Sequence, residues 1–199
     1  MIVKRVRILV LTALLVGAAT GMSGCPGDGD IVLFPDQGLE EAVRAELGIY
    51  FGFIRQGDMD QLRTLNARNV GITRLHGLEF ATNLISLDVG NDALPEQGIA
   101  DLTPVTLLRK LNLLNVENNA ITNVAPLTGL LNLDQLYLAG NQIFHILPLV
   151  TNSDSGGLAD GDTVTLSRAP LVDDSRTPPA ISEDVGRLVA NGVVVQLVE

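Results

Sequence analysis

A repeat of 22 residues constrains this chain more than any other feature. One set of positions holds Leu111, Leu114, Val116, Asn119, Ile121, Val124, Pro126 and Leu127. The same order recurs 22 residues later as Leu133, Leu136, Leu138, Asn141, Ile143, Ile146, Pro148 and Leu149. Earlier copies keep part of the frame, and an insertion of five residues falls at Asn91–Gly98, before the copy that begins at Leu111. Self-similarity at a fixed interval is the signature of a repeat architecture.

The repeated pattern LxxLxLxxNxI has a physical reading at each position. The L-x-L piece alternates with a period of two, which predicts a short strand with one buried face. The asparagine amide can satisfy backbone groups that are left open where the strand ends. The Pro-Leu pair blocks helix continuation and favours a 3₁₀ or extended return. The sequence therefore predicts an α/β repeat solenoid: a short, right-handed, curved leucine-rich-repeat solenoid with a parallel sheet on its concave face.

The ends of such a solenoid need caps, and the chain divides accordingly. We expect a signal peptide at 1–24, a tether at 25–30, an N-terminal helical cap at 31–61, repeats at 62–171 and a C-terminal cap at 172–199. Asp36 is the expected N-cap of a helix over Gln37–Leu47 that ends at Gly48. The other expected cap elements are a short helix from after Asp58 to Leu65, a helix over Ile181–Ala190 and a strand over Val193–Val195.

The segment Ile49–Ile54 holds three of the seven aromatic residues of the chain. Two interpretations are open. The segment fills the gap between the cap helices, or it forms an exposed apolar patch. We favour the first, because apolar residues near the end of a domain usually cover its core.

The amino terminus has the order of an export signal. Lys4, Arg5 and Arg7 precede the apolar run Ile8–Ala18, and small residues follow. Met22-Ser23-Gly24-Cys25 resembles the bacterial lipobox, which implies that Cys25 carries the lipid and that residues 1–24 are removed. The alternatives are an uncleaved membrane anchor and ordinary secretion with a free thiol. Pro26 is not an inner-membrane retention residue, which favours an outer-membrane or cell-surface location for the exported lipoprotein.

Composition excludes several classes of function. The net charge is −10, and removing the three cations of residues 1–24 takes it to −13. Such an acidic body repels nucleic acid. Cys25 is the only cysteine, which excludes an internal disulfide framework and zinc fingers. We expect no cofactor and a monomer.

No catalytic motif is present, so we do not expect an enzyme. The chain lacks G-x-S-x-G, the phosphate-binding G-x-x-x-x-G-K-[ST] and H-E-x-x-H. His76 and His145 lie in separate convex turns with no third metal ligand near them in the sequence. The stretch Asn152–Asp160 vaguely resembles a calcium loop but lacks the closing glutamate, where Thr163 stands. We interpret it as a polar loop that leads into the last strand.

Taken together, residues 31–195 resemble the internalin-type bacterial leucine-rich-repeat lipoproteins. The resemblance rests on the cap helix segment Phe34–Gly48, on the first convex turn Leu75–Leu84, on the Pro-Leu returns and on the closing segments Gly161–Leu166 and Asn191–Val195. It implies the fold strongly and the function only as a class, because partners differ between such scaffolds. The asparagine position departs from the pattern at Val70, Asp92 and Ala169.

The expected function is a lipid-anchored binding module for protein ligands. Its candidate ligand face is formed by the outward residues of the two most regular repeats: Leu113, Asn115, Glu117, Gln135 and Tyr137. A tyrosine on a rigid sheet orders at low entropic cost, as a recognition anchor requires. Asn119 and Asn141 are expected to be buried turn residues that do not contact ligand. The alternative is a structural envelope lipoprotein with no dedicated ligand.

Overall fold

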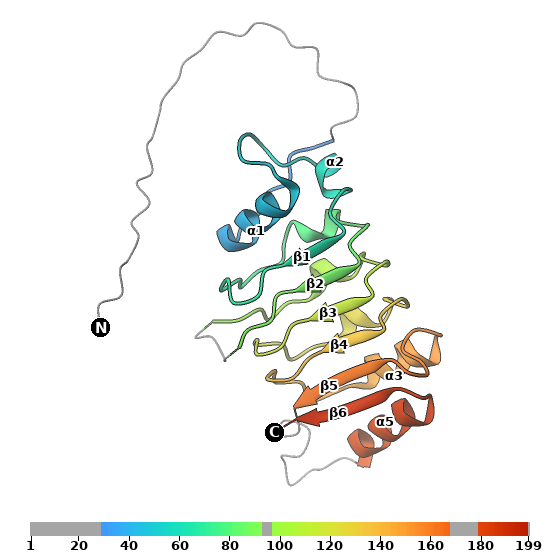
Figure 1. Ribbon diagram of the computed structural model, residues 1–199. Coiled ribbons are helices and arrows are strands. Elements are labelled where there is room, and N and C mark those ends of the chain that lie inside the picture. The colour runs from blue at the N-terminus through green and yellow to red at the C-terminus, as the bar shows by residue number, and fades with distance from the viewer. Residues whose placement is uncertain (1–28, 93–96, 168–178, 199) are drawn as a thin grey trace, which may run out of the picture.

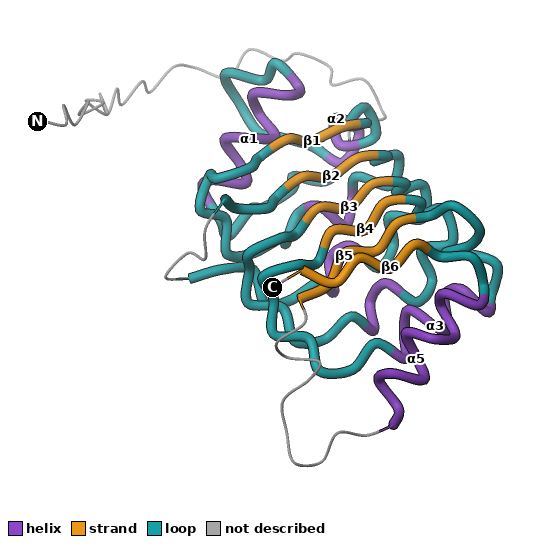
Figure 2. The backbone as a smooth tube through the Cα atoms, turned by 60° about the horizontal axis from the view of Figure 1, so that its bottom comes forward, coloured by secondary structure: helices purple, strands orange, loops and turns teal. Residues whose placement is uncertain are grey.

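The structure, a computed structural model, describes residues 29–92, 97–167 and 179–198. Six strands form one parallel sheet in the order β1-β2-β3-β4-β5-β6. The strands stack side by side in one sheet, and the short helical segments that connect successive strands lie behind this sheet (Figures 1 and 2). The strand bounds are β1 Thr64–Asn66, β2 Ser86–Asp88, β3 Leu113–Asn115, β4 Gln135–Tyr137, β5 Thr163–Ser167 and β6 Val194–Val198. The fold is the predicted short leucine-rich-repeat solenoid.

The core is a ladder of aliphatic side chains behind the sheet. The central residue of each three-residue strand points inward, because alternate side chains of a strand lie on opposite faces. The strand register stacks these residues directly upon one another, as Leu65, Leu87, Leu114, Leu136 and Val164. Each is at most 2% exposed. A second buried row comes from the returns, with Leu78, Val105, Leu127 and Leu149.

The first cap helix was predicted correctly. Helix α1 spans Gln37–Leu47, Asp36 is its N-cap and Gly48 ends it in the left-handed conformation at φ 68°. Its buried face carries Leu39 and Val43, and the helix packs against β1. It therefore covers the first repeat, whose leucines would otherwise be exposed.

The second predicted cap helix was wrong in position. Helix α2 is a single turn over Gln56–Met59, and β1 begins at Thr64. Asp58 is not the N-cap but the third helical residue, and its carboxylate accepts a hydrogen bond from the Arg55 N–H at 2.8 Å. The chain leaves the helix after Met59 because Leu62 and Leu65 belong to the leucine ladder, which requires an extended backbone there.

The predicted role of the aromatic segment was also wrong. Tyr50, Phe51 and Phe53 are 77%, 92% and 68% exposed, so they do not fill a gap between cap helices. Only Ile54 is buried. The space beneath the cap is already filled by Leu39, Val43, Met59 and other aliphatic side chains. The aromatics form the exposed patch that was the second interpretation.

The returns take two forms. Three are 3₁₀ turns, as predicted: η1 Leu78–Phe80, η2 Thr103–Val105 and η3 Ala125–Leu127. The fourth is instead an α-helix, α3, over Leu147–Asp154. Leu136 and Val164 stack directly although they are 28 residues apart in the sequence, and the six residues beyond the usual 22 provide the length for a helix. The polar loop predicted from Asn152 is thus partly helical.

The C-terminal cap contains a helix and a strand. Helix α5 spans Pro179–Ala190, two residues longer than predicted, and β6 begins one residue later than the predicted strand and continues to Val198. Leu188 of α5 is buried, and Arg187 pairs with Asp154 of α3 at 2.6 Å. The expected signal peptide, Cys25 and the Ala169–Leu171 turn lie outside the described residues. Within the described ranges, no helix is both long enough and apolar enough to cross a bilayer.

Candidate binding face

The strand register brings four of the five predicted ligand-face residues into one compact group. Leu113 of β3 lies directly beside Gln135 of β4, and Asn115 lies beside Tyr137. All four point away from the core because Leu114 and Leu136, between them, point into it. We call this surface, together with Glu117, the outer sheet face.

The tyrosine on this face is held in place. The Tyr137 hydroxyl donates a hydrogen bond to the Gln135 Oε1 atom at 3.1 Å, and its side chain is partly buried between its neighbours. Asn115 Oδ1 accepts from the Glu117 N–H at 3.0 Å, and Asn115 Nδ2 donates to Glu117 Oε2 at 3.5 Å. A partly exposed aromatic with a fixed polar tip thus lies beside an ordered amide and carboxylate.

The side chain of Arg68 also reaches this face. Its Nε donates to Asp92 Oδ1 at 2.9 Å, and its Nη1 lies 3.6 Å from Asp88 Oδ1 and 3.8 Å from Glu117 Oε2. One guanidinium from the first repeat therefore reaches acids of the next two.

Arg68 can reach across the second repeat because Gly90, which lies in its way, has no side chain. Arg68, Gly90 and Glu117 each stand two residues after the end of their strand, and they form one outward column across the first three repeats. A Cβ at Gly90 would lie 2.6 Å from Asn115 Oδ1 and 2.8 Å from Arg68 Nη1. The guanidinium and the amide occupy the space that any other residue would fill. Ala139, in the same column, is also small and is buried.

The electrostatics of this cluster follow from one cation among three acids. The hydrogen bond to Asp92, followed by the nearby charge of Asp88, raises the pKa of Arg68 further above its ordinary value. The hydrogen bond from Arg68, and a second from Asn69 Nδ2 at 2.7 Å, lower the pKa of the Asp92 carboxyl. With three acidic side chains and one basic one, the cluster has a negative formal charge.

Asn119 and Asn141 lie beneath the face and not on it. They are 3% and 5% exposed. Asn119 Nδ2 donates to the carbonyls of Val89, Val116 and Glu117, and its Oδ1 accepts from the Ile99 N–H at 2.9 Å. Asn141 repeats the arrangement with the carbonyls of Val116, Leu138 and Ala139 and with the Ile121 N–H.

Two other buried asparagines were missed from the sequence. In the second repeat Asn91, and not Asp92, is the buried polar residue, and its Nδ2 donates to the Asn118 carbonyl at 3.2 Å. Asp92 is exposed because it pairs with Arg68. Asn152 is 1% exposed, donates to carbonyls of the preceding return and accepts from the Leu158 N–H. Composition alone could not separate these residues from the polar residues around them.

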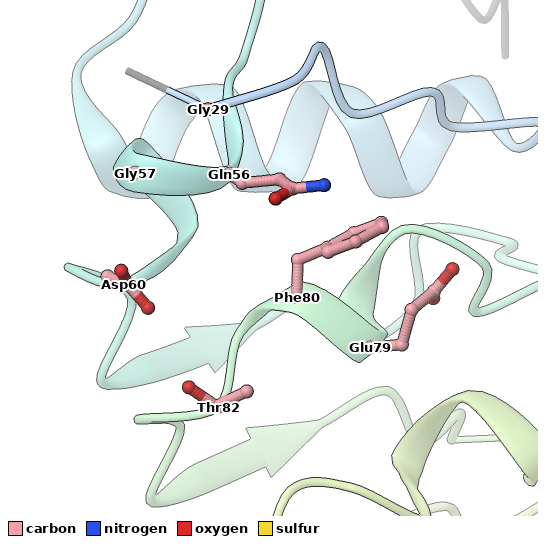
Figure 3. Close-up of a pocket in the computed structure, with 7 residues that line it drawn as sticks. All are labelled: Gly29, Gln56, Gly57, Asp60, Glu79, Phe80 and Thr82. Carbon is pink, nitrogen blue, oxygen red and sulfur yellow. The ribbon is translucent and has the colours of Figure 1, made fainter. Parts of the chain in front are cut away.

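Two open hollows in the described surface are lined by none of the five residues of this face. One, of about 330 Å³, lies between α2 and η1. Figure 3 shows Gln56 and Phe80 facing each other across it, with Asp60 and Thr82 on one side and Glu79 on the other. A second lies near Ile85, Lys110 and Asp134. Among the described residues, no group of three or more His, Cys, Asp or Glu side chains is placed to hold a metal ion.

Comparison with solved structures decides the type of fold. The chain superposes on the internalin InlF from Listeria monocytogenes with a TM-score of 0.60 and 23% sequence identity, over 83% of this chain. It has an internalin-type fold. At this level of identity the likeness concerns the fold alone. The internalin-type fold here spans about half of that protein, 52% of its chain.

Other internalins of the same organism match less well in geometry. Internalin C2 gives a TM-score of 0.34 at 20% identity, covering 84% of this chain and 95% of its own. The functional domain of InlJ gives 0.35 at 20% identity, covering 67% and 36%. Scores this low support no argument. No protein-family model matches the sequence, and no curated protein matches it.

Proposed function

We propose that this protein is an exported, lipid-anchored, non-catalytic module that binds a protein ligand on its outer sheet face. The observation that carries the proposal is the register of β3 and β4, which sets Leu113 and Asn115 against Gln135 and Tyr137 on one rigid surface. An apolar spot framed by fixed polar groups is the composition that recognition anchors use.

The charge of the face defines the partner chemistry. Asp88, Asp92 and Glu117 outnumber Arg68, the cation that they share, so the face attracts a basic ligand surface. Tyr137 and Leu113 supply the apolar contact beside it. The partner is therefore expected to present an apolar group flanked by Lys or Arg.

The lipid anchor is supported by the order of residues 1–25 and by the single cysteine. We expect that the protein from membrane extracts begins at Cys25 and carries diacylglycerol on the thiol. Intact-mass measurement tests this, and Cys25→Ser should leave the chain unprocessed or release it from the membrane. An unmodified Cys25 thiol in membrane extracts would overturn the anchor.

The ligand face is tested by the footprint of a bound partner. The chain has two tyrosines, which makes Tyr50→Ala a matched control for Tyr137→Ala. Residues 25–199 serve as bait, because the buried apolar residues of the described chain all lie between Val32 and Val193. We expect crosslinks and hydrogen-exchange protection on β3 and β4, and at least ~10-fold weaker binding for Tyr137→Ala.

Two outcomes would contradict the ligand face. A footprint confined to the returns, or equal affinity of Tyr137→Ala and wild type, rejects Tyr137 and its surroundings as the binding site. If the bait captures no partner from envelope extracts and crosslinks to none in intact cells, the protein is instead a structural lipoprotein without a dedicated ligand.

A further inference from the structure

The exposed aromatics of the cap lie on and just before a segment that pairs with the start of the described chain. Ile31 pairs with Arg55 in an antiparallel bridge, and the Val32 N–H donates to the Ile54 carbonyl at 2.9 Å. Continuing this register places Leu33 opposite Phe53. Val32 and Ile54 are buried, so their neighbours point to the opposite side, since side chains alternate along extended chain.

This alternation exposes Ile31, Leu33 and Phe53, and the turn before Phe53 exposes Tyr50 and Phe51. Leu33 is 78% exposed, Ile31 is 42% exposed, and Tyr50, Phe51 and Phe53 are also largely exposed. We call these five residues the apolar cap edge. Five large apolar side chains so close together exceed the single exposed residues that are normal on a soluble domain.

The loop that carries the aromatics is held in a fixed shape. The Arg44 guanidinium donates to the Gly52 carbonyl at 3.0 Å and to the Ile49 carbonyl at 3.4 Å, while Glu40 accepts from the same guanidinium at 2.8 Å. Gly52 allows the tight turn through its positive φ of 85°. The exposure of Phe51 and Phe53 is therefore a property of the fold.

The position of Cys25 limits how far this edge can be from a membrane. Five residues lie between Cys25 and Ile31, and the six steps of a fully extended chain between them span about 20 Å. A lipid on Cys25 would thus keep the cap within about 20 Å of the bilayer surface, while the last repeats lie at the other end of the strand stack (Figure 1).

We propose that the apolar cap edge inserts into the interface of the bilayer in which the Cys25 lipid is anchored, so that the solenoid stands on its N-terminal cap. This inference rests on the proposed lipid anchor. The tyrosine side chain is suited to the headgroup boundary, because its hydroxyl can stay in water while its ring is buried, and the phenylalanine rings add apolar area below that level. Arg55, with its guanidinium near the Gly29 carbonyl, lies beside the edge and can reach lipid phosphates.

The test uses the single cysteine and the absence of tryptophan. Residues 25–199 are coupled through Cys25 to a maleimide phospholipid in phosphatidylcholine vesicles, which reproduces the anchor without cellular processing. Phe51→Trp then reports on the edge. We expect its emission to shift to shorter wavelength and to be quenched by brominated lipid.

A matched control is available in the fourth repeat. Phe144 is also an exposed phenylalanine, and Phe144→Trp should keep the emission of a water-exposed indole in the same vesicles. Adding Tyr50→Ser and Phe53→Ser to the Phe51→Trp chain should abolish the shift. With Cys25→Ser and no coupling, the same two changes should weaken vesicle partitioning about tenfold or more, since burying one such ring is worth at least that factor.

Three results would overturn the membrane contact. The first is an unshifted Phe51→Trp spectrum in coupled vesicles. The second is an equal shift for Phe144→Trp, which would mean that the whole surface associates without orientation. The third is a shift in uncoupled protein without vesicles that grows with concentration, which would assign the edge to a second copy. The lipid anchor is judged separately, by the mass of Cys25 in membrane extracts.

Discussion

Asn119 and Asn141 make the same set of hydrogen bonds one repeat apart, and this repetition shows what the residue is for. Each side-chain Nδ2 donates hydrogen bonds to carbonyls at the end of its own strand and in the previous repeat, while each Oδ1 accepts from a backbone N–H. Alanine removes the oxygen that accepts from the Ile99 or Ile121 N–H, whereas the carbonyls of Val116, Glu117 and Ala139 keep other donors. A buried unpaired polar group costs about 1–3 kcal/mol.

We therefore expect Asn119→Ala and Asn141→Ala each to lower the free energy of unfolding by about 1–3 kcal/mol, as measured by urea denaturation. Asn66→Ala is the control, because Asn66 is exposed and accepts only one local hydrogen bond, from the Arg68 N–H. Unchanged unfolding midpoints for both buried-site variants would show that these amides do not support the turns.

A second prediction at this scale concerns the space above Gly90. Gly90→Ala would displace two side-chain ends, Arg68 Nη1 and Asn115 Oδ1, and both can move away at little cost in stability. Losing the guanidinium removes the main cause of the lowered pKa of Asp92. We expect Gly90→Ala and Arg68→Ala both to return the Asp92 pKa toward its ordinary value, as measured by carboxyl NMR titration.

The sign of the accompanying pH effect follows from the direction of the shift. A carboxyl whose pKa is lowered by folding stabilises the fold above its unfolded pKa, and this contribution is lost as the pH falls through the folded pKa. Arg68→Ala should therefore be less stable than wild type at neutral pH, and the difference in the free energy of unfolding should disappear in acid. A lowered Asp92 pKa that persists in both variants would assign the shift to Asn69 alone.

Among the elements, helix α1 is tied to the repeats through its N-cap. Asp36 Oδ1 accepts from the Leu39 N–H at 3.1 Å, while Oδ2 accepts from the Thr73 N–H at 2.8 Å and from the Arg74 N–H at 3.2 Å. Burial by itself raises the pKa of this carboxyl, but the hydrogen bonds from Thr73, Leu39 and Arg74 together hold it below its ordinary value. One side chain thus caps the helix and fastens it to the first return.

We expect Asp36→Ala to lower the free energy of unfolding by about 1–2 kcal/mol at neutral pH, the usual cost of losing an N-cap and its bonds. Glu41→Ala on the same helix is the control, because Glu41 is exposed and bonds only to Gln37. The Asp36 contribution is fully present above the unfolded pKa of about 3.9 and is lost as the pH falls through the lowered folded pKa. A difference from wild type that stays constant down to pH 2 would contradict the role given to the charge.

The elements also show where sequence reasoning succeeds. Helix α1 could be predicted from Asp36 and Gly48 because capping is local chemistry. The columns of the outer sheet face followed from spacing because stacked repeats leave no freedom of register. These features depend on residues that are close together in the chain or that recur at the repeat spacing.

The features that could not be predicted depend on packing between distant residues. Tyr50 and Phe53 are exposed because aliphatic residues elsewhere already fill the cap core. Asn152 is buried because α3 folds over the carbonyls of the third return. The Arg68 guanidinium reaches Glu117 of the outer sheet face only through the space that Gly90 leaves. Each outcome depends on volume or distance in three dimensions, which a single sequence does not encode in any one motif.

At the scale of the whole molecule, most packing is between neighbouring repeats, and the contact from Arg68 to Glu117 is an exception that skips one. Strand contacts run from β1 to β6 in order, and α1 packs on β1 while α5 packs on α3 and β6. Stability is then approximately a sum of repeat and neighbour contributions. Damage at one repeat should weaken the adjacent ones first.

We expect Asn141→Ala to raise amide hydrogen exchange at the Ile121 turn and around β4, and to leave α1 as protected as in wild type. The hydrogen bonds from Ile121 and to Val116 identify the neighbours that lose support. Native-state hydrogen exchange read by mass spectrometry checks this pattern. Uniform loss of protection from α1 to α5 would mean that the solenoid unfolds as one cooperative unit.

The strict register of the sheet also fixes the distances between the side chains on its outer face. Asp88 and Tyr137 stand in the same column, separated by β3, and adjacent strands are about 4.8 Å apart. Two steps of that spacing are about 10 Å, close to the rise of two turns of an α-helix. A ligand that meets both the acidic cluster and the tyrosine must therefore carry its basic and apolar groups about 10 Å apart. The interval is fixed by the backbone of the solenoid, so side-chain substitutions on the face alter the affinity for a ligand without altering the spacing that selects it.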